Sequence, residues 1–382
     1  MFAASGCTDT VGTDSSSDGG TGGEATGGTD PGGADQTGLP PDGTSLPGGT
    51  QDGDDGDTTA GGAEEEGEES STGEEEPRGL ACLNDQFVHG ESPGPDYTKL
   101  GVTVGEHCQG TDHQDITEIE RVVFLGDSVT VGTPPAPVPG FYRSLVADQL
   151  AERFGLEAPQ ALWQQFDPFG GTSVIQESGD FASCAVWGAR NDDIMGQMED
   201  CFSVEDFDQR TLVIMTMGGN DVSSIAQDSI AGVPIADVFH DLEEMVQHHE
   251  DAINWLVEPD RFPNGVFVVN ANVYEYTDFT VDVLSCPAAS VAGFDANPKN
   301  PELLLGSLNL INEEYARVAS ETGTDLVFMF ESFCGHGFKA GDPDNVCYRG
   351  EGNENWFDLT CIHPTAAGHE ALAEMFINVV DE

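Results

Sequence analysis

Short apolar runs alternate with longer amphipathic stretches along residues 121–382. Runs rich in Val, Ile, Leu and Phe are typical of strands buried on both faces, whereas apolar residues three or four apart are typical of helices. The pattern predicts strands at 121–125, 181–190, 212–217, 265–270 and 325–330, and helices at 141–154, 235–256, 303–321 and 366–380. Strands that alternate with helices form βαβ units. We therefore expect an α/β fold, a three-layer α/β/α sandwich with a central parallel sheet.

Polar turns interrupt this pattern at three places. The first predicted strand stops at Gly-Asp-Ser, residues 126–128, and the third stops at Gly-Gly-Asn-Asp, residues 218–221. The last of the three places is Cys-Ile-His-Pro at 361–364, directly before the last predicted helix. The carboxyl ends of parallel strands meet at one edge of a sheet, and a serine becomes a nucleophile when a base takes its proton and donors stabilise the oxyanion. These segments predict a hydrolase site with Ser128 as nucleophile and His363 as base.

Together the three segments resemble the motif blocks of the SGNH hydrolases, also called the GDSL lipase/esterase superfamily. The resemblance covers roughly residues 121–382 and implies a flavodoxin-like sheet. In that family the serine of the first block is the nucleophile and the histidine of the fifth block is the base. The backbone N–H groups of the serine and of the second-block glycine, with the side-chain amide of the third-block asparagine, bind the oxyanion. The matching residues are Ser128, Gly188, Asn220 and His363.

The resemblance does not fix the group that orients His363. Family members commonly place an aspartate three residues before the histidine, and that position is Thr360. Asp358 lies five residues before His363 and reaches the ring only if the loop bulges. A backbone carbonyl from Thr360 or Cys361 is the alternative, which some family members use. Both alternatives stay open from the sequence.

The first part of the chain has the composition of a disordered tether. Residues 5–76 are mainly Gly, Ser, Thr, Asp, Glu and Pro, with almost no large apolar side chain and no Lys or Arg. Such a segment cannot bury enough apolar surface to offset its ordering entropy. We therefore predict three parts: a disordered acidic tether over 1–78, a disulfide-stapled extension over 79–120 and an SGNH hydrolase domain over 121–382.

The chain is strongly acidic, because 70 acidic and 12 basic residues give it a formal net charge of −58. Its only lysines are Lys99, Lys299 and Lys339, so the excess of negative charge is not confined to the tether. A surface of this sign disfavours nucleic acid and anionic membrane surfaces as partners. A medium of high ionic strength, which would screen the self-repulsion, is one interpretation of this composition.

Nine cysteines favour an oxidising compartment. Because the sequence has no CxxC pair and no HExxH helix, we expect no structural zinc, no other metal and no cofactor. Proximity in the sequence suggests three disulfides, and two remaining cysteines give a fourth: Cys82–Cys108, Cys184–Cys201, Cys334–Cys347 and Cys286–Cys361. This pairing is an expectation, because eight cysteines allow many connectivities.

The ninth cysteine, Cys7, ends the sequence Ala-Ser-Gly-Cys, which resembles a bacterial lipobox. Lipidation of Cys7 would anchor the protein, and the tether would let the enzyme stand off a membrane. The charged and apolar parts of a signal peptide are missing before Cys7, so they would lie upstream of the printed sequence. A chance Gly-Cys in a low-complexity tail is the alternative. The expected location is the bacterial cell envelope or surface, as an exported lipoprotein of the outer membrane or the extracellular space.

We expect a monomeric serine esterase or lipase that hydrolyses carboxylic esters through an acyl-enzyme, without a cofactor. Its partner is a small-molecule, lipid or glycan ester, and the N-terminal lipid is its only contact with a membrane. Two alternatives use the same site, namely a carbohydrate O-deacetylase and an acyltransferase. The third alternative is a non-catalytic surface-binding module, which would not react with a fluorophosphonate probe.

Some further side chains carry weaker expectations. His248 and His249 lie on a predicted helix and are expected at the surface. His369 is expected to pack against the last helix's neighbours or to be solvated. Trp187 and Trp356 flank the predicted site segments and are candidates for the wall of an acyl or sugar pocket.

Overall fold

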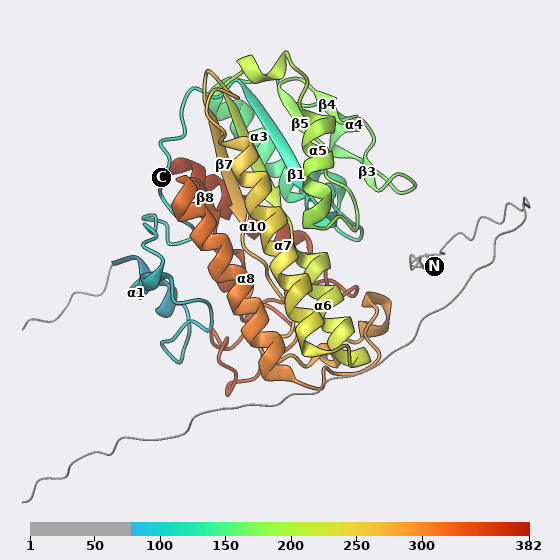
Figure 1. The fold of residues 1–382 in the computed structure, drawn as a ribbon. Coiled ribbons are helices and arrows are strands. Elements are labelled where there is room, and N and C mark those ends of the chain that lie inside the picture. Colours follow the sequence, from blue (N-terminus) through green and yellow to red (C-terminus); the bar gives the residue numbers. More distant parts are fainter. Residues whose placement is uncertain (1–77) are drawn as a thin grey trace, which may run out of the picture. The chain divides into compact units, whose positions relative to one another are not determined.

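A mixed sheet with the strand order β4-β5-β1-β6-β7-β8 forms the centre of the protein (Figure 1). The computed structural model describes residues 78–382. The strands of this sheet are β1 (Arg121–Gly126), β4 (Glu177–Ser178), β5 (Phe181–Ser183), β6 (Thr211–Thr216), β7 (Val266–Ala271) and β8 (Asp325–Val327). All neighbouring pairs are parallel except β4 with β5. Counted in chain order, the parallel strands run 2-1-3-4-5, which is the expected flavodoxin-like arrangement.

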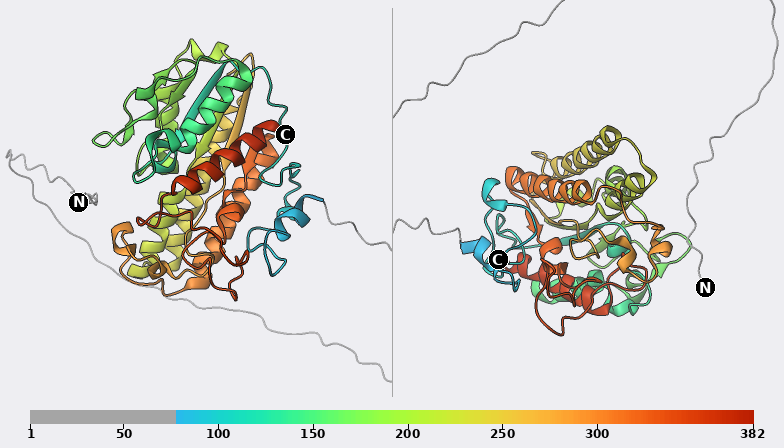
Figure 2. Two further views of the ribbon diagram at one scale, coloured as in Figure 1. Left: turned by 180° about the vertical axis from the view of Figure 1, so that it is seen from behind. Right: turned by 90° about the horizontal axis from the view of Figure 1, so that it is seen from below.

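Helices cover both faces of the sheet (Figure 2). The helices α3 (Tyr142–Phe154) and α10 (Ala366–Asp381) pack on one face, and α5 (Ile194–Cys201), α7 (Ile235–Leu256) and α8 (Pro301–Thr322) pack on the other. Successive residues of β1 serve opposite layers: Phe124 belongs to the first apolar cluster and Leu125 to the second. Because both faces are buried, the strand is apolar throughout, as a central parallel strand requires.

The segment before β1 covers the open edge of the sheet at β8. The N–H of Thr111 donates to the carbonyl oxygen of Leu326, and the N–H of Phe328 donates to that of Gln109. At the other edge, the two-residue strand β4 pairs antiparallel with β5. The hairpin of β2 (Phe166–Asp167) and β3 (Thr172–Ser173) forms a separate small sheet. Neither edge therefore presents a long unpaired strand.

Two predicted strands are shorter than expected. β8 ends at Val327, and the apolar residues after it form the short helix α9 (Met329–Phe333). β5 ends at Ser183, and the chain then turns at Gly188 with a φ of +79°. The expected extents were wrong because a buried apolar run looks alike in a strand and in a buried helical turn.

Among the helices of eight or more residues, two were not expected, α5 and α6 (Gly219–Ala231). The sequence of α6 begins with Gly-Asn-Asp and contains three serines, all residues with low intrinsic preference for a helix. Its position between α7 and α8 therefore results from tertiary packing rather than from a strong local signal.

Four disulfides staple the described residues, and they join Cys82–Cys108, Cys184–Cys201, Cys286–Cys361 and Cys334–Cys347. Three of these are the pairs that sequence proximity suggested, and Cys286–Cys361 is the expected remaining pair. Disulfides in this number indicate an exported or extracellular protein. Between residues 78 and 382, no helix is both long enough and apolar enough to cross a membrane. That same part of the chain contains no group of three or more His, Cys, Asp or Glu side chains arranged to hold a metal ion.

The N-terminal extension begins with α1 (Arg78–Asn84) and a short 3-10 helix, η1 (Tyr97–Lys99). Tyr97 stacks on Phe328 at 4.7 Å, and its hydroxyl donates to Glu331 at 2.7 Å. The extension thus packs against the end of β8 and the start of α9. The predicted tether and Cys7 lie outside the described residues, as does the lipobox-like sequence.

Candidate active site

Ser128 lies at the carboxyl end of β1, where it is the first residue of the short helix α2 (Ser128–Val131). Gly126 makes this turn possible, because a Cβ at that position would overlap the carbonyl oxygen of Thr216 on β6. Asp127 caps the helix, since its Oδ1 accepts from the N–H of Val129 at 2.9 Å. The nucleophile candidate is therefore held at the sheet edge by a fixed turn.

A buried hydroxyl network fixes the far side of α2. Thr130 Oγ1 lies 2.6 Å from the hydroxyl oxygen of Tyr142 and 2.7 Å from Thr216 Oγ1. In the nucleophile elbow of α/β-hydrolases a glycine occupies the position of Thr130. The turn around Ser128 is therefore of a different type.

His363 contacts Ser128 directly. Its Nε2 lies 2.9 Å from Ser128 Oγ. Two bonds hold the loop before α10: the N–H of Asp358 donates to His363 O at 2.9 Å, and the hydroxyl of Tyr274 donates to Ile362 O at 2.7 Å. Burial lowers the pKa of His363 to about 4. The ring is therefore neutral at neutral pH and can accept a proton from the serine.

The other ring nitrogen of His363 contacts a hydroxyl. His363 Nδ1 lies 2.8 Å from Thr360 Oγ1, and this hydroxyl donates to Asp358 Oδ1 at 2.5 Å. The N–H of Thr360 donates to the same carboxylate oxygen at 2.7 Å. Neither alternative from the sequence describes this contact. Asp358 reaches the ring only through Thr360, and the ring's partner is a side chain rather than a backbone carbonyl.

A disulfide lies inside this loop. Cys361, between Thr360 and His363, is joined to Cys286, and its backbone has a φ of +73°. A non-glycine residue at such a φ is held there by its surroundings. The disulfide therefore helps to fix the positions of Thr360 and His363.

Gly188 lies beside the nucleophile turn. The segment before it runs along α2: the N–H of Val186 donates to Gly126 O at 3.0 Å, and Trp187 Nε1 donates to Gly132 O at 3.2 Å. Gly188 itself is exposed, with open space where a Cβ would be. Its backbone is accordingly accessible to a substrate that is bound at Ser128.

Asn220 lies in the first turn of α6 and faces the same segment. Its side-chain Nδ2 donates to Ala189 O at 2.9 Å, one residue after Gly188. A side-chain amide has two N–H donors, so one can keep this contact while the other binds an oxyanion. The structure thus brings together the four site residues that the sequence suggested, Ser128, Gly188, Asn220 and His363.

An open cleft with about 970 Å³ of empty volume begins at Ser128 and Asn220. It extends between α6, the start of α8 and the irregular segment 273–294. Trp187 and Trp356 do not line it: Trp187 stacks on Phe166 at 5.3 Å and Trp356 stacks on the His336 ring at 3.5 Å. The sequence had no signal for this cleft, because two of its three walls, α6 and the segment 273–294, lack strong patterns.

The remaining histidines that the sequence singled out lie outside the catalytic contact. His249 is buried, contrary to expectation, and stacks on Tyr315 at 3.8 Å, while His248 is exposed. The apolar stripe of α7 explains this, because His249 lies on the face that meets α8. His369 is buried, and its Nδ1 accepts from the N–H of Tyr142 at 3.3 Å.

No protein with curated information matches the chain. Among solved structures, a gut microbial diltiazem-metabolizing enzyme aligns at 15% identity with a TM-score of 0.45 over 70% of this chain and 49% of its own, so the chain spans about half that enzyme's length. An extracellular lipase from Streptomyces rimosus aligns at 18% identity and a TM-score of 0.39, over 68% of this chain and 99% of its own.

The acetylxylan esterase Axe2 from Geobacillus stearothermophilus aligns at 14% identity and a TM-score of 0.39, over 70% of this chain and 97% of its own. Likeness at this level says nothing of the substrate. The family model for GDSL-like lipases and acylhydrolases matches residues 124–371, which is well over half of the chain and includes Ser128 and His363. The protein belongs to the GDSL-like lipase/acylhydrolase family.

Proposed function

We propose that the protein hydrolyses carboxylic esters through an acyl-enzyme formed on Ser128. The observation that carries this proposal is the 2.9 Å contact between Ser128 Oγ and His363 Nε2. His363 takes the proton as Ser128 attacks the carbonyl carbon, and returns it to the leaving alcohol oxygen. Water then attacks the acyl-enzyme with His363 again acting as base, which releases the acid and restores the serine.

The oxyanion of each tetrahedral intermediate needs preorganised donors. We assign this role to the backbone N–H groups of Ser128 and Gly188 and to the side-chain amide of Asn220. The contact between Asn220 and Ala189 supports this assignment, because it holds the amide next to the exposed backbone of Gly188. Loss of one such donor typically costs about 10²–10³ in kcat.

Thr360 and Asp358 orient the base in this proposal. When Nε2 accepts from Ser128, the ring proton lies on Nδ1 and donates to Thr360 Oγ1. The Thr360 hydroxyl then donates to Asp358 Oδ1, with which it forms a 2.5 Å bond. Every hydrogen bond in this series is donated toward the carboxylate. Asp358 therefore favours the productive tautomer of His363 through the hydroxyl of Thr360. Burial raises the pKa of Asp358, and the two bonds from Thr360 act in the opposite direction.

The test compares ester hydrolysis by the wild-type protein, Ser128→Ala and His363→Ala. We expect each variant to lose at least about 10⁴-fold in kcat/KM, because neither partner works alone. Ser203→Ala and His240→Ala are matched controls, since both side chains are exposed and neither lines the cleft at Ser128. Wild-type activity in Ser128→Ala would disprove the proposal. A folded wild-type protein without turnover would favour the non-catalytic binding module.

Transfer of the acyl group to an alcohol other than water is the alternative that shares the intermediate. Adding glycerol or a monosaccharide to the assay separates the two activities. A hydrolase releases free acid in proportion to the alcohol that leaves the ester. An acyltransferase instead forms a new ester at the expense of the free acid.

We also propose that the enzyme is anchored to the bacterial envelope by a lipid on Cys7. The four disulfides support export, and the lipobox-like sequence before Cys7 supports lipidation. Cells that express the full chain and receive labelled palmitate should yield labelled protein, and Cys7→Ala should abolish the label. Labelling that persists in Cys7→Ala contradicts this anchor.

A further inference from the structure

The cleft at Ser128 is apolar beyond its catalytic end. Its hydrophobic lining includes Ala226, Val281, Val283, Phe294, Leu304 and Leu308. The carboxylate of Glu275 also lies in the wall, but it is occupied by the backbone N–H groups of Thr277 and Phe279, each at 2.5 Å. Although the hydroxyl side chains of Ser223 and Thr277 also line it, the wall is mainly apolar and suits an aliphatic chain better than a sugar ring.

One face of α6 lines the cleft from the oxyanion site to this apolar surface. Asn220, Ser223 and Ala226 line the cleft at intervals of three residues, which places them along a single helix face. Ala226 lies six residues beyond Asn220, about 9 Å along the helix axis. An aliphatic chain of several carbon atoms that starts at the reacting carbonyl is thus long enough to reach the apolar part.

The position of the cleft assigns it to one side of the ester. The leaving alcohol oxygen must lie within reach of His363 Nε2, because this nitrogen gives it a proton. Ser128, Gly219 and Asn220 line the cleft, and so does Ile362, the residue before His363, whereas His363 itself and Gly188 do not. Because the ring of His363 is not part of the lining, we place the leaving alcohol outside the cleft and the acyl chain inside it.

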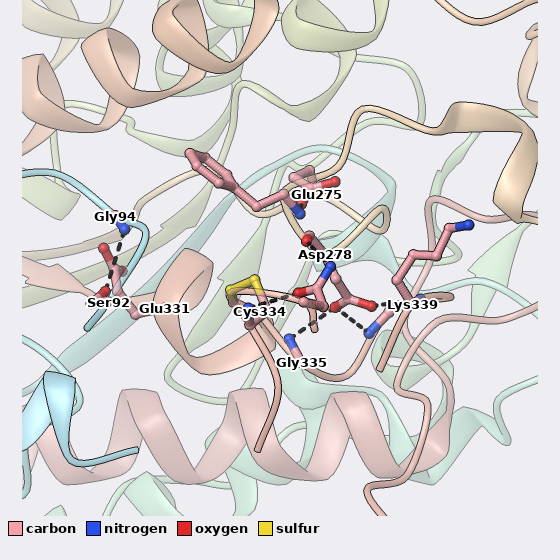
Figure 3. Close-up of a disulfide and its surroundings, with 12 residues drawn as sticks. Ser92, Gly94, Glu275, Asp278, Glu331, Cys334, Gly335 and Lys339 are labelled. Carbon is pink, nitrogen blue, oxygen red and sulfur yellow. Dashed lines mark hydrogen bonds between the residues drawn. A yellow bond between two sulfur atoms is a disulfide. The ribbon is translucent and has the colours of Figure 1, made fainter. Parts of the chain in front are cut away.

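The wall opposite α6 is fixed by buried bonds of Asp278 (Figure 3). Asp278 Oδ1 accepts from the N–H groups of Gly335 and Gly337, both at 2.8 Å, and Oδ2 accepts from that of Lys339 at 2.7 Å. The disulfide Cys334–Cys347 staples the same loop. Since a preformed site costs less ordering entropy on binding, this wall favours a defined chain length.

We propose that this cleft binds the aliphatic acyl chain of the substrate, so that the enzyme prefers acyl groups of about six to ten carbons over acetyl. The inference rests on the proposed ester hydrolysis and narrows its substrate class. It favours a medium-chain carboxylic ester over an acetylated carbohydrate. Each methylene buried in the cleft is expected to raise kcat/KM about fourfold.

The first test uses two isomeric esters, ethyl octanoate and octyl acetate. Their carbon content is the same, and only the side of the long chain differs. We expect the wild-type enzyme to hydrolyse ethyl octanoate at least about 50-fold better in kcat/KM, from three or more buried methylenes. Octyl acetate should be no better than ethyl acetate. A preference for octyl acetate would place the alcohol in the cleft and overturn the inference.

The second test obstructs the cleft with Ala226→Phe and, in a smaller step, with Ala226→Val. The ratio of kcat/KM for ethyl octanoate to that for ethyl acetate should fall by about 15- to 60-fold in Ala226→Phe, the loss of two or three methylene sites. In Ala226→Val the same ratio should fall by an intermediate amount. This variant also tests the inference if the larger side chain of Ala226→Phe prevents folding. Ala231→Phe, an exposed alanine on the same helix, should leave the ratio unchanged.

Fluorophosphonate labelling of each preparation separates the two claims. Protein that labels at Ser128 but prefers ethyl acetate, or keeps its octanoate ratio in both Ala226 variants, overturns the acyl cleft and leaves ester hydrolysis intact. Preferential turnover of acetylated xylo-oligosaccharide over ethyl octanoate also overturns the inference. Folded protein without labelling contradicts the proposed function itself.

Discussion

At the scale of single residues, the main departure from the family pattern is a threonine where an aspartate is common. We predict that Thr360→Ala lowers kcat/KM by about 10- to 100-fold, less than the roughly 10⁴-fold known for loss of a direct carboxylate partner. Thr360→Ser, which keeps the hydroxyl, should recover most of the activity. Activity in Thr360→Ala within twofold of wild type would show that the ring needs no side-chain partner.

Asp358 contacts the His363 ring only through Thr360. Its substitution therefore separates the effect of the carboxylate charge from the effect of holding the Thr360 hydroxyl in place. We expect Asp358→Asn to lose about tenfold in kcat/KM, because the amide oxygen still accepts from Thr360 but without charge. The loss in a double variant with Thr360→Ala should be smaller than the product of the single losses, since both act on the same ring contact. Independent, multiplicative losses would contradict the series of bonds.

The pH profile reports the protonation of His363. Only the neutral ring accepts a proton, so kcat/KM rises with pH through the pKa of His363, which burial lowers to about 4. We predict an acidic limb centred near pH 4 and constant activity between about pH 5.5 and 8. A limb centred near pH 7 that disappears in Asp127→Asn would assign the profile to Asp127 instead, because burial raises that carboxyl's pKa to about 7.

Much of the site could be predicted from the sequence, because strand ends place residues by topology. Ser128, Asn220 and His363 each lie next to an apolar strand or a helix start, and the structure brings all three together. The role of the Thr360 side chain could not be predicted, because it depends on a loop whose shape is set by the Cys286–Cys361 disulfide.

At the scale of elements, the disulfide Cys286–Cys361 should affect both stability and activity, whereas Cys184–Cys201 should affect stability alone. By loop length, the first, with a separation of 75 residues, should contribute about 4.5 kcal/mol to stability and the second, with 17, about 3 kcal/mol. We predict that replacing Cys286 and Cys361 by serine also lowers kcat/KM by tenfold or more. Replacing Cys184 and Cys201 should change kcat/KM less than twofold at a temperature where both variants are folded, and an equal loss in both would contradict this.

A second prediction at this scale concerns the loop that supports the cleft wall. A Cβ at Gly337 would overlap the carbonyl oxygen of Tyr276, whereas one at Gly341 meets no atom within 4 Å. Gly337→Ala should therefore lower the free energy of unfolding by about 1–3 kcal/mol, and Gly341→Ala should change it by less than about 0.5 kcal/mol. Urea unfolding measures both, and equal stability of the two variants would contradict the close approach.

The sheet and its long helices were predictable, but the segment that shapes the cleft was not. The helices at 235–256 and 301–322 have clear apolar stripes, and β1, β6 and β7 are continuous apolar runs. Between β7 and α8, however, Asp278, Phe279 and Val281 all adopt positive φ, a conformation that their residue types rarely take. Long-range bonds such as those of Asp278 impose it, and these are invisible in local sequence.

At the scale of the whole molecule, the net charge of −58 sets the response to salt. Self-repulsion of an acidic surface is screened as the Debye length falls to about 3 Å at 1 M salt. We predict that the melting temperature rises by several degrees with added NaCl and that most of the rise occurs below about 0.5 M. A melting temperature that is the same with and without salt would contradict this interpretation.

The most direct test of the account is covalent labelling of the serine. Wild-type protein is treated with an alkyl fluorophosphonate, and the modified residue is identified by peptide mass mapping. The account predicts one adduct per chain, on Ser128, with slower labelling in His363→Ala and none in Ser128→Ala. Folded wild-type protein that forms no adduct, or forms one on another residue, would contradict it.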